Sequence, residues 1–244
     1  VTISEDTLTS IGVGNVQQTV IAGQNIQSAI DLVDNKNGGA VLLKSGTHTI
    51  ITALTGKSSL KIVGDNYLTT IIDFNSTSAN LSFTGTSVYT TGTITSITGG
   101  VNVTGAGTAW LANVTTSHQI FIAQRWYKIA AVLTDTTLTL AEGYDGGATL
   151  PGASYRAAKV IENLTIENVT IKNSTGTALA FTDCRNVILK YAHPESSNVG
   201  LSMTNVSEVA LDNSLSVSHT SDGVQLTNVG FADIESTNSA GNGG

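Results

Sequence analysis

The stretch LAFTDC at residues 179–184 recurs twice further along the chain, as LSMTNV at 201–206 and as VQLTNV at 224–229. The steps between the copies are 22 and 23 residues. Self-similarity at a fixed period of this length indicates stacked supersecondary units that share a core with their neighbours. A second, aliphatic column keeps the same phase at Ile166, Leu189, Leu211 and Ile234.

The residues within each repeat favour a parallel β-helix over a leucine-rich repeat. Each unit alternates apolar and polar positions with a period of two, is rich in Val, Ile and Thr, and is divided by Gly, Asn, Asp and Ser. The L-x-x-L-x-L core of a leucine-rich repeat is absent. The spacing predicts two inward columns and one polar column at a bend. We interpret the polar column as a structural ladder. The columns are Phe181, Met203 and Leu226; Leu164, Val187, Val209 and Ala232; and Asp183, Asn205 and Asn228.

The composition of the 244-residue chain bears on its partners. Charged residues make up 12% of it, and its net charge of −7 argues against nucleic acid. No apolar run approaches the roughly 20 residues of a membrane span, and no metal or cofactor motif is present, so we expect no membrane partner, metal or cofactor. The single cysteine, Cys184, shares a column with Val206, which predicts a buried thiol. Because the chain starts with Val1 and stops in mid-pattern at Gly244, we expect it to be part of a longer protein.

One amphipathic helix is predicted near the N-terminus. Asn25 is its expected cap and the glycine pair at 38–39 its expected end. A helix here would close the open end of a solenoid, directly before strands at 40–50, 59–64 and 70–74. Its apolar stripe consists of Ile26, Ala29, Ile30 and Val33.

The order of these N-terminal segments also carries information about the fold. It runs NIQSAID at 25–31, the glycine pair, LKSGTH at 43–48, LKIVG at 60–64 and TIID at 70–73. This order resembles the opening of the pectate-lyase-like right-handed parallel β-helices, in particular the branch of phage tailspikes and polysaccharide depolymerases. The resemblance covers about residues 20–84 and 158–244, and it is specific for the fold rather than for an activity. It implies a polysaccharide partner, a homotrimer, and a location on a virion tail or otherwise outside the cell.

The repeat is interrupted between its two parts. Residues 1–84 are expected to hold the capping helix and the first rungs, residues 85–158 an inserted antiparallel β-barrel-like domain, and residues 159–244 the continuing rungs. Trp110 and Trp126 both lie in the insert. They form its core or, in the case of Trp126, present a face that stacks on sugar. Five strands are expected in the insert, at 93–98, 101–110, 119–132, 136–141 and 154–157.

Candidate catalytic residues follow from the same period. Glu167, Lys190, Asp212 and Glu235 each follow an inward aliphatic residue, at steps of 23, 22 and 23. Neighbouring rungs lie about 4.8 Å apart, so Asp212 and Glu235 would stand near the separation of the carboxylates of retaining glycosidases. Two close carboxylates raise one pKa, and Lys190 could bind an acidic sugar. The alternative is a solvated charge ladder with no chemical role.

A rival cluster lies in the turns. His219 and Asp222 follow His193 and Glu195 by about one rung, and histidine beside a carboxylate suits acid–base chemistry. Tyr191, His193 and Glu195 are further candidates for substrate binding. Ordinary turn chemistry is the alternative for all of them. The paired aspartates and the His-Gly and Arg-x-Lys elements of polygalacturonases are absent, which argues against that type of hydrolysis.

Three functions remain open at this point. The chain is a tailspike-like protein that recognises a cell-surface polysaccharide and, if it is an enzyme, degrades it as a lyase or a glycoside hydrolase. Alternatively, it is a carbohydrate-binding module without catalytic activity, or a structural spacer in an appendage. Fold by itself does not decide among them.

Overall fold

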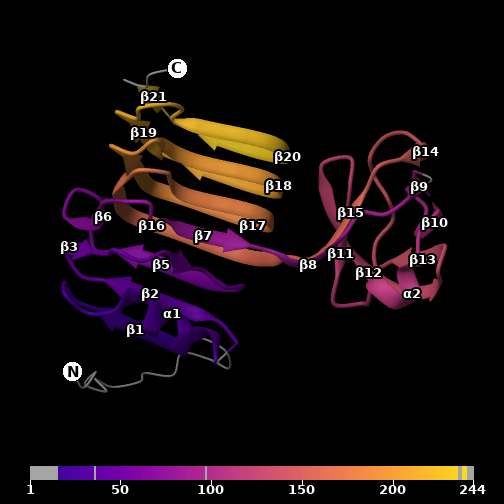
Figure 1. Ribbon diagram of the computed structural model, residues 1–244, viewed down its shortest axis with the longest axis horizontal. Coiled ribbons are helices and arrows are strands. Elements are labelled where there is room, and N and C mark those ends of the chain that lie inside the picture. The colour runs from indigo at the N-terminus through magenta and orange to yellow at the C-terminus, as the bar shows by residue number, and fades with distance from the viewer. Residues whose placement is uncertain (1–15, 36, 97, 236–237, 241–244) are drawn as a thin grey trace.

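The computed structural model describes residues 16–35, 37–96, 98–235 and 238–240, which form a stack of parallel strands with a separate antiparallel sheet at its side (Figure 1). The stack is a right-handed parallel β-helix. Its main path of hydrogen-bonded neighbours joins seven strands. They are, in order, β1 (Val16–Val20), β2 (Gly39–Leu43), β5 (Leu60–Gly64), β16 (Ile161–Ser174), β17 (Thr177–Glu195), β18 (Val199–Asp212) and β20 (Val224–Glu235).

Six further strands complete the rungs of the β-helix. The predicted strand at 40–50 is two strands, because Lys44 and Ser45 interrupt it and Gly46, with a φ of 138°, begins the second. β1 was not predicted; it lies before the helix and pairs in parallel with β2. These strands are β3 (Gly46–Thr49), β4 (Leu54–Thr55), β6 (Thr70–Thr77), β7 (Leu81–Thr84), β19 (Leu215–Val217) and β21 (Asn238–Ala240).

The register between rungs confirms the predicted columns. Phe181 of β17 pairs with Met203 of β18, and Met203 pairs with Leu226 of β20. The column continues to Phe83 of β7, whose ring lies parallel to that of Phe181 at a centroid distance of 5.0 Å. Phe83, Phe181 and Met203 are buried, whereas Leu226, on the last strand of the main path, is 46% exposed. The second inward column is in register through Leu164, Val187, Val209 and Ala232.

The bends between the straight segments use left-handed backbone. In β16 to β20 the non-glycine residues with positive φ are Asn, Asp or Ser at every position except two, Tyr191 at 48° and Glu208 at 59°. Short polar side chains tolerate this conformation because they bond locally to the backbone, whereas larger ones rarely adopt it. The other positions are Asn163, Asn168, Asn173, Asp183, Asn186, Ser196, Asn205, Asn213, Ser218 and Asn228.

Helix α1 (Ile26–Asp34) confirms the predicted cap. The side chain of Asn25 accepts a hydrogen bond from the backbone N–H of Ser28 at 3.1 Å. The predicted apolar stripe is buried against the first rungs of the β-helix, and Figure 1 shows the helix at the N-terminal end of the stack. None of the helices in the described ranges is long and apolar enough to cross a bilayer.

The strands from β8 to β15 form an antiparallel sheet of eight strands with its own hydrophobic core. Its strand order is β14-β9-β10-β13-β12-β11-β15-β8. Within its core the Nε1–H of Trp110 donates to the hydroxyl of Tyr155 at 2.9 Å. The elements are β8 (Thr86–Tyr89), β9 (Thr93–Ser96), β10 (Asn102–Ala106), α2 (Trp110–Asn113), β11 (Gln119–Ile122), β12 (Arg125–Thr134), β13 (Thr137–Leu140), β14 (Leu150–Ala153) and β15 (Arg156–Lys159).

The predicted number of five strands in this sheet is wrong. The segment 119–132 is a hairpin, because Ala123 and Gln124 both adopt positive φ and turn the chain between β11 and β12. Neither residue signals a turn. β14 contains Pro151 and Gly152, which read as a turn rather than as a strand. Trp110 lies in helix α2 rather than at the end of a strand.

Cys184 is a free, fully buried thiol, as its column predicted. It is in register with Val206, and its Sγ lies 3.4 Å from the carbonyl oxygen of Thr182. Burial raises the pKa of the Cys184 thiol far above its ordinary value. The thiol is therefore part of the packed interior and not a nucleophile.

Candidate functional site

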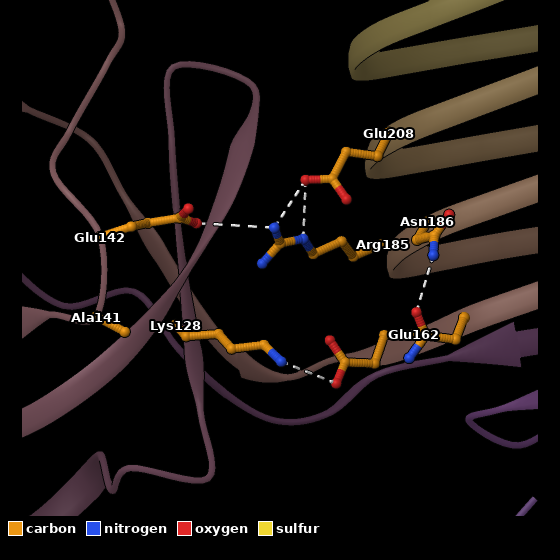
Figure 2. Close-up of a pocket in the computed structure, with 8 residues that line it drawn as sticks. Lys128, Ala141, Glu142, Glu162, Arg185, Asn186 and Glu208 are labelled. Atoms are coloured by element: carbon orange, nitrogen blue, oxygen red, sulfur yellow. Dashed lines mark hydrogen bonds and ion pairs between the residues drawn. The ribbon is translucent and has the colours of Figure 1, made fainter.

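A polar cleft of ≈ 320 Å³ lies between the antiparallel sheet and the bends of β16 to β18. Figure 2 shows charged side chains pointing into it from both sides. Lys128 comes from β12, and Ala141 and Glu142 follow β13. The β-helix side of the lining consists of Glu162, Asn163, Arg185, Asn186 and Glu208.

One column of the β-helix explains why the cleft opens where it does. Glu162 pairs with Arg185, Arg185 with Ser207, and Ser207 with Gly230. The β11–β12 hairpin rests on the two small residues: a Cβ added to Gly230 would lie 1.8 Å from the backbone oxygen of Gln124. On the other two rungs the larger side chains of Glu162 and Arg185 line the open cleft instead.

Arg185 is the centre of the cleft's charge network. Its Nη2 lies 2.8 Å from the Oε1 of Glu208 and 3.7 Å from the Oε1 of Glu142, so it joins the β-helix to the antiparallel sheet. Its Nε also donates to Glu208, at 2.9 Å. Burial works against the charged form, but the surrounding carboxylates outweigh it and raise the pKa of Arg185. The guanidinium is therefore a permanent, positioned cation.

Glu162 and two asparagines complete the polar lining. The Oε2 of Glu162 accepts a hydrogen bond from the Nε2 of Gln119 at 2.9 Å, and its Oε1 lies 3.5 Å from the Nζ of Lys128. The Nδ2 of Asn186 donates to the Oδ1 of Asn163 at 2.8 Å. Carboxylates, amides, a guanidinium and an ammonium at one surface provide both donors and acceptors, which suits a ligand rich in hydroxyl groups.

Glu208 departs from the pattern of its own bend. Asn163, Asn186 and Glu208 occupy successive rungs, all in the left-handed region, with φ values of 61°, 55° and 59°. A long side chain in this conformation costs about 1–2 kcal/mol that asparagine largely avoids. The sequence analysis did not predict the cleft. The replacement of Asn by Glu at position 208 of the repeat was a signal that could have indicated it.

The predicted acidic column is in register but lies on the open sheet. Glu167 pairs with Lys190, Lys190 with Asp212, and Asp212 with Glu235. The Nζ of Lys190 stands 3.7 Å from the Oδ2 of Asp212, with side chains 46% and 34% exposed. Lys61 lies 3.0 Å from Glu167 in the same way. These ion pairs are typical of a solvated charge ladder, and a catalytic role of Asp212, Glu235 and Glu167 stays a prediction.

The rival histidine cluster is not a surface feature. His219 is only 3% exposed, and its Nδ1 accepts the backbone N–H of Ser197 at 3.4 Å. Its Nε2 lies 3.2 Å from the carbonyl oxygen of Pro194. Burial lowers the pKa of His219, so the ring is neutral and fixed in a turn. His219 is thus buried, whereas the half-buried Asp222 accepts a hydrogen bond from Gln225 at 2.6 Å. An acid–base role of His219 and Asp222 stays a prediction.

His193, Tyr191 and Glu195 are half-buried and remain accessible in part. The Nε2–H of His193 donates to the carbonyl oxygen of Asn213 at 3.1 Å. Burial lowers the pKa of His193 despite this hydrogen bond. A role of these residues in substrate binding stays a prediction.

The prediction that Trp126 stacks on sugar is wrong. The side chain is fully buried and packs against Phe121 and Ala158. Its Nε1–H donates to the backbone oxygen of Asn205 at 2.8 Å, so Trp126 joins the antiparallel sheet to β18. Tryptophan was expected to fill the core of the insert or to bind sugar, and Trp126 instead fills the joint between the two parts.

The cleft offers no evident metal site. Among the residues that the structure describes, no group of three or more His, Cys, Asp and Glu side chains has a geometry that could hold a metal ion.

The chain is a parallel β-helix protein with an antiparallel sheet docked on one face and a polar cleft between the two.

No protein-family model and no curated protein matches the chain. Among solved structures, it is similar to the tailspike gp49 of Pseudomonas phage LKA1, at 16% identity and a TM-score of 0.47, over 87% of this chain and 43% of that one. It is similar to the tailspike gp61 of Pseudomonas phage phi297, at 12% identity and a TM-score of 0.41, over 84% and 41%. It is also similar to the Gp54 tailspike of Acinetobacter baumannii bacteriophage AP22, solved in complex with A. baumannii capsular saccharide, at 10% identity and a TM-score of 0.42, over 90% and 44%.

The chain therefore spans less than half the length of each of these three tailspikes. At such identities a structural likeness concerns the fold alone.

Proposed function

We propose that the chain is a tailspike-like protein that binds a cell-surface polysaccharide in the cleft between the β-helix and the antiparallel sheet. The observation that carries this proposal is the composition of the cleft. Its lining presents carboxylates, amides and two cations in one open space of ≈ 320 Å³. Sugar hydroxyls need paired donors and acceptors of this kind, and a volume in this range suits a small ligand or a short stretch of a polymer.

The rigidity of the lining supports the same proposal. Arg185 is held by Glu208 and Glu142, and Glu162 by Gln119 and Lys128. Side chains that are already fixed lose little conformational entropy when a ligand arrives.

Glycoside hydrolysis in the same cleft is a second candidate function, and Glu208 favours it. Glu142 and Glu208 both contact the Nη2 of Arg185, at 3.7 and 2.8 Å, so two carboxylates from opposite sides of the cleft meet at one guanidinium nitrogen (Figure 2). Glycosidases act with such a pair of carboxyl groups. Backbone strain is often retained where a side chain has a functional role, and Glu208 carries such strain.

A binding experiment with a cleft variant tests the proposal. Isothermal titration against capsular, O-antigen and pectic polysaccharides would compare the unmodified chain with the double variant Lys128→Gln, Glu208→Asn. We expect at least one polysaccharide to bind the unmodified chain and to bind the variant about tenfold or more weakly, because two charged contacts are lost. The matched control is Lys57→Gln, which removes a lysine that pairs with Asp34 of α1. Equal binding by the double variant, or no binding by any chain, would refute the proposal.

Product analysis then separates a binder from an enzyme. New reducing ends indicate hydrolysis, and unsaturated uronates indicate a lyase. Binding without either product identifies a carbohydrate-binding module, and absence of binding favours a structural spacer. If Glu208 takes part in hydrolysis, Glu208→Gln should lose cleavage while the polysaccharide still binds.

Assembly and location belong to the same proposal. The resemblance to tailspikes supports a homotrimer on a virion tail or another extracellular appendage. Sedimentation equilibrium of the chain tests the trimer, and a monomeric mass at all concentrations would refute trimer formation by this part of the protein.

A further inference from the structure

Tyr191 is the second residue that departs from the chemistry of the bends. It shares its bend with Asn168 and Asn213 on the neighbouring rungs, and all three have positive φ, of 56°, 48° and 48° for residues 168, 191 and 213. Asparagine is the residue that suits this conformation, whereas a tyrosine is strained there. The strain at Tyr191 therefore requires a reason other than the geometry of the bend.

The ring of Tyr191 lies beside an aromatic residue from a distant part of the sequence. Tyr67, in the loop between β5 and β6, is nearly parallel to it, with an interplanar angle of 8° and a centroid distance of 5.9 Å. The ring of His193 also packs against Tyr67, and the centroids of these two rings are 4.2 Å apart. All three residues are half-buried, so each keeps part of its surface accessible to solvent.

Local hydrogen bonds hold this aromatic cluster in place before any ligand binds. The hydroxyl of Thr170 donates to the backbone oxygen of Tyr67 at 2.8 Å, and Asn66 accepts the backbone N–H of Leu68 at 2.8 Å. His193 is fixed by its hydrogen bond to Asn213. Rigid, partly exposed aromatic faces of this kind bind at a low cost in conformational entropy.

The cluster and the cleft lie at the two ends of one straight segment. Asn186 lines the cleft and Tyr191 marks the next bend of β17, five residues further along. At about 3.3 Å per residue, the two bends are roughly 16 Å apart. The outward face between them carries Ile188, which is 38% exposed, and Lys190. A disaccharide is too short to reach from one bend to the other, whereas a longer oligosaccharide can.

We infer that Tyr67 and Tyr191 form an aromatic subsite that stacks on the apolar face of one pyranose ring, while other sugar units of the same glycan occupy the cleft. The inference rests on the proposed function. Pyranose rings present a face of C–H groups that packs on a flat aromatic ring, and tyrosine adds a polar tip for a hydroxyl. The subsite makes recognition depend on glycan length.

The variant Tyr191→Asn tests the inference without damaging the fold. It removes the ring and installs the residue found at the same bend on both neighbouring rungs, so the melting temperature should stay equal or rise. The probes are maltohexaose, chitohexaose and hexagalacturonate, together with the corresponding disaccharides. Any hexasaccharide that binds the unmodified chain should bind Tyr191→Asn about tenfold more weakly, while the disaccharide binds both chains equally. Tyr191→Phe keeps the aromatic face and should bind nearly as the unmodified chain does.

Each result of this experiment is decisive. A hexasaccharide that binds Tyr191→Asn as well as the unmodified chain overturns the inference, and if the same glycan is lost from the Lys128→Gln, Glu208→Asn chain, the proposed function stands. If none of the glycans binds the unmodified chain at millimolar concentration, the subsite inference fails, because stacking on a pyranose face is generic. The wider polysaccharide titration then decides the proposed function separately.

Discussion

Two columns of left-handed bends face the antiparallel sheet, and they differ in what covers them. Asp183, Asn205 and Asn228 form one column, with φ values of 54°, 53° and 52°. Asn163, Asn186 and Glu208 form the other, at 61°, 55° and 59°. The backbone is the same in both, so the difference between them lies in the side chains and their surroundings.

The antiparallel sheet covers the first column at Asp183 and Asn205, whereas Asn228 is exposed. Arg156 of β15 donates from Nε and Nη2 to the two oxygens of Asp183 at 2.6 and 2.7 Å, and the Asp183 side chain is only 1% exposed. Asn205 donates to Asp183 at 3.0 Å, and Asn228 donates to Asn205 at 3.1 Å. The predicted structural ladder is thus confirmed, with Arg156 as an anchor that the repeat did not contain.

The second column stays open and loses its ladder after two rungs. Asn186 donates to Asn163, but Glu208 turns to Arg185 in the cleft. A covered bend must satisfy every polar group within the protein, whereas an open bend can be satisfied by water or by a ligand. The same left-handed backbone therefore serves stability in the column that is covered and is free to serve binding in the column that is not.

The largest effect is expected from breaking the covered column. Asp183→Ala leaves Arg156 without its buried partner and removes the acceptor of Asn205, so the free energy of unfolding should fall by about 3–5 kcal/mol. Urea denaturation followed by circular dichroism measures this. The matched variant Asp183→Asn keeps the ladder and the bend, and should lose clearly less. A loss below about 1 kcal/mol for Asp183→Ala would mean that the pair behaves like an exposed ion pair.

The next effect concerns the docking of the hairpin. Gly230→Val places side-chain atoms where the backbone of Gln124 lies, so the β11–β12 hairpin must move off the rung. We expect a loss of about 1–3 kcal/mol and faster hydrogen exchange in β11 and β12. Gly176→Ala is the control, because an added Cβ there would approach nothing closer than the Ser174 hydroxyl at 3.8 Å. Unchanged exchange in the hairpin would show that it does not depend on the small residue.

The burial of His219 in a turn of the β-helix should also make stability depend on pH. Burial lowers the pKa of His219 below its ordinary value of 6.5, so the unfolded chain takes up the proton more readily than the folded one. The stabilisation is complete above pH 6.5 and is lost as the pH falls toward the folded-state pKa. Melting temperatures measured from neutral to mildly acidic pH should decline, and the decline should be shallower in His219→Gln. An equal slope in both chains would assign the effect to other groups, such as His118 and His193.

The smallest expected effect is a gain in stability. Glu208→Asn restores the residue found at this bend on the two preceding rungs and relieves the strained backbone, although it gives up a partly exposed ion pair. The free energy of unfolding should rise by about 0.5 kcal/mol, while glycan binding falls. The reverse change, Asn186→Glu, should lower stability at an equivalent position. A stability loss in Glu208→Asn would show that Arg185 needs this carboxylate more than the bend needs asparagine.

Much of the β-helix could be predicted because its information is periodic. The pairing of Glu167 with Lys190 and of Asp212 with Glu235 follows from steps of 23 residues, and the register bears it out. A single-residue slip would turn each inward column to the outside, so the apolar pattern specifies one register. The capping helix was predictable for a similar local reason, since Asn25 and the apolar stripe lie next to each other in sequence.

The cleft could not be predicted because half of it comes from outside the period. Lys128 and Glu142 belong to the antiparallel sheet, and no repeat relates their positions to Glu162 or Arg185. Trp126 shows the same limit, since its burial depends on contact with β18 rather than on its own neighbours. Tyr67 and Tyr191 are far apart in sequence, and only the winding of the rungs brings their rings together.

The amino-acid sequence alone determined the coiling of the backbone, the register of its rungs and the residues that turn inward, because these depend on local alternation repeated at a constant interval. The tertiary structure decided which outward residues are covered, paired or open. That outcome depends on where one non-repetitive sheet docks, and the docking is governed by the shape of a few side chains, from the missing Cβ of Gly230 to the ion pair of Arg156 with Asp183.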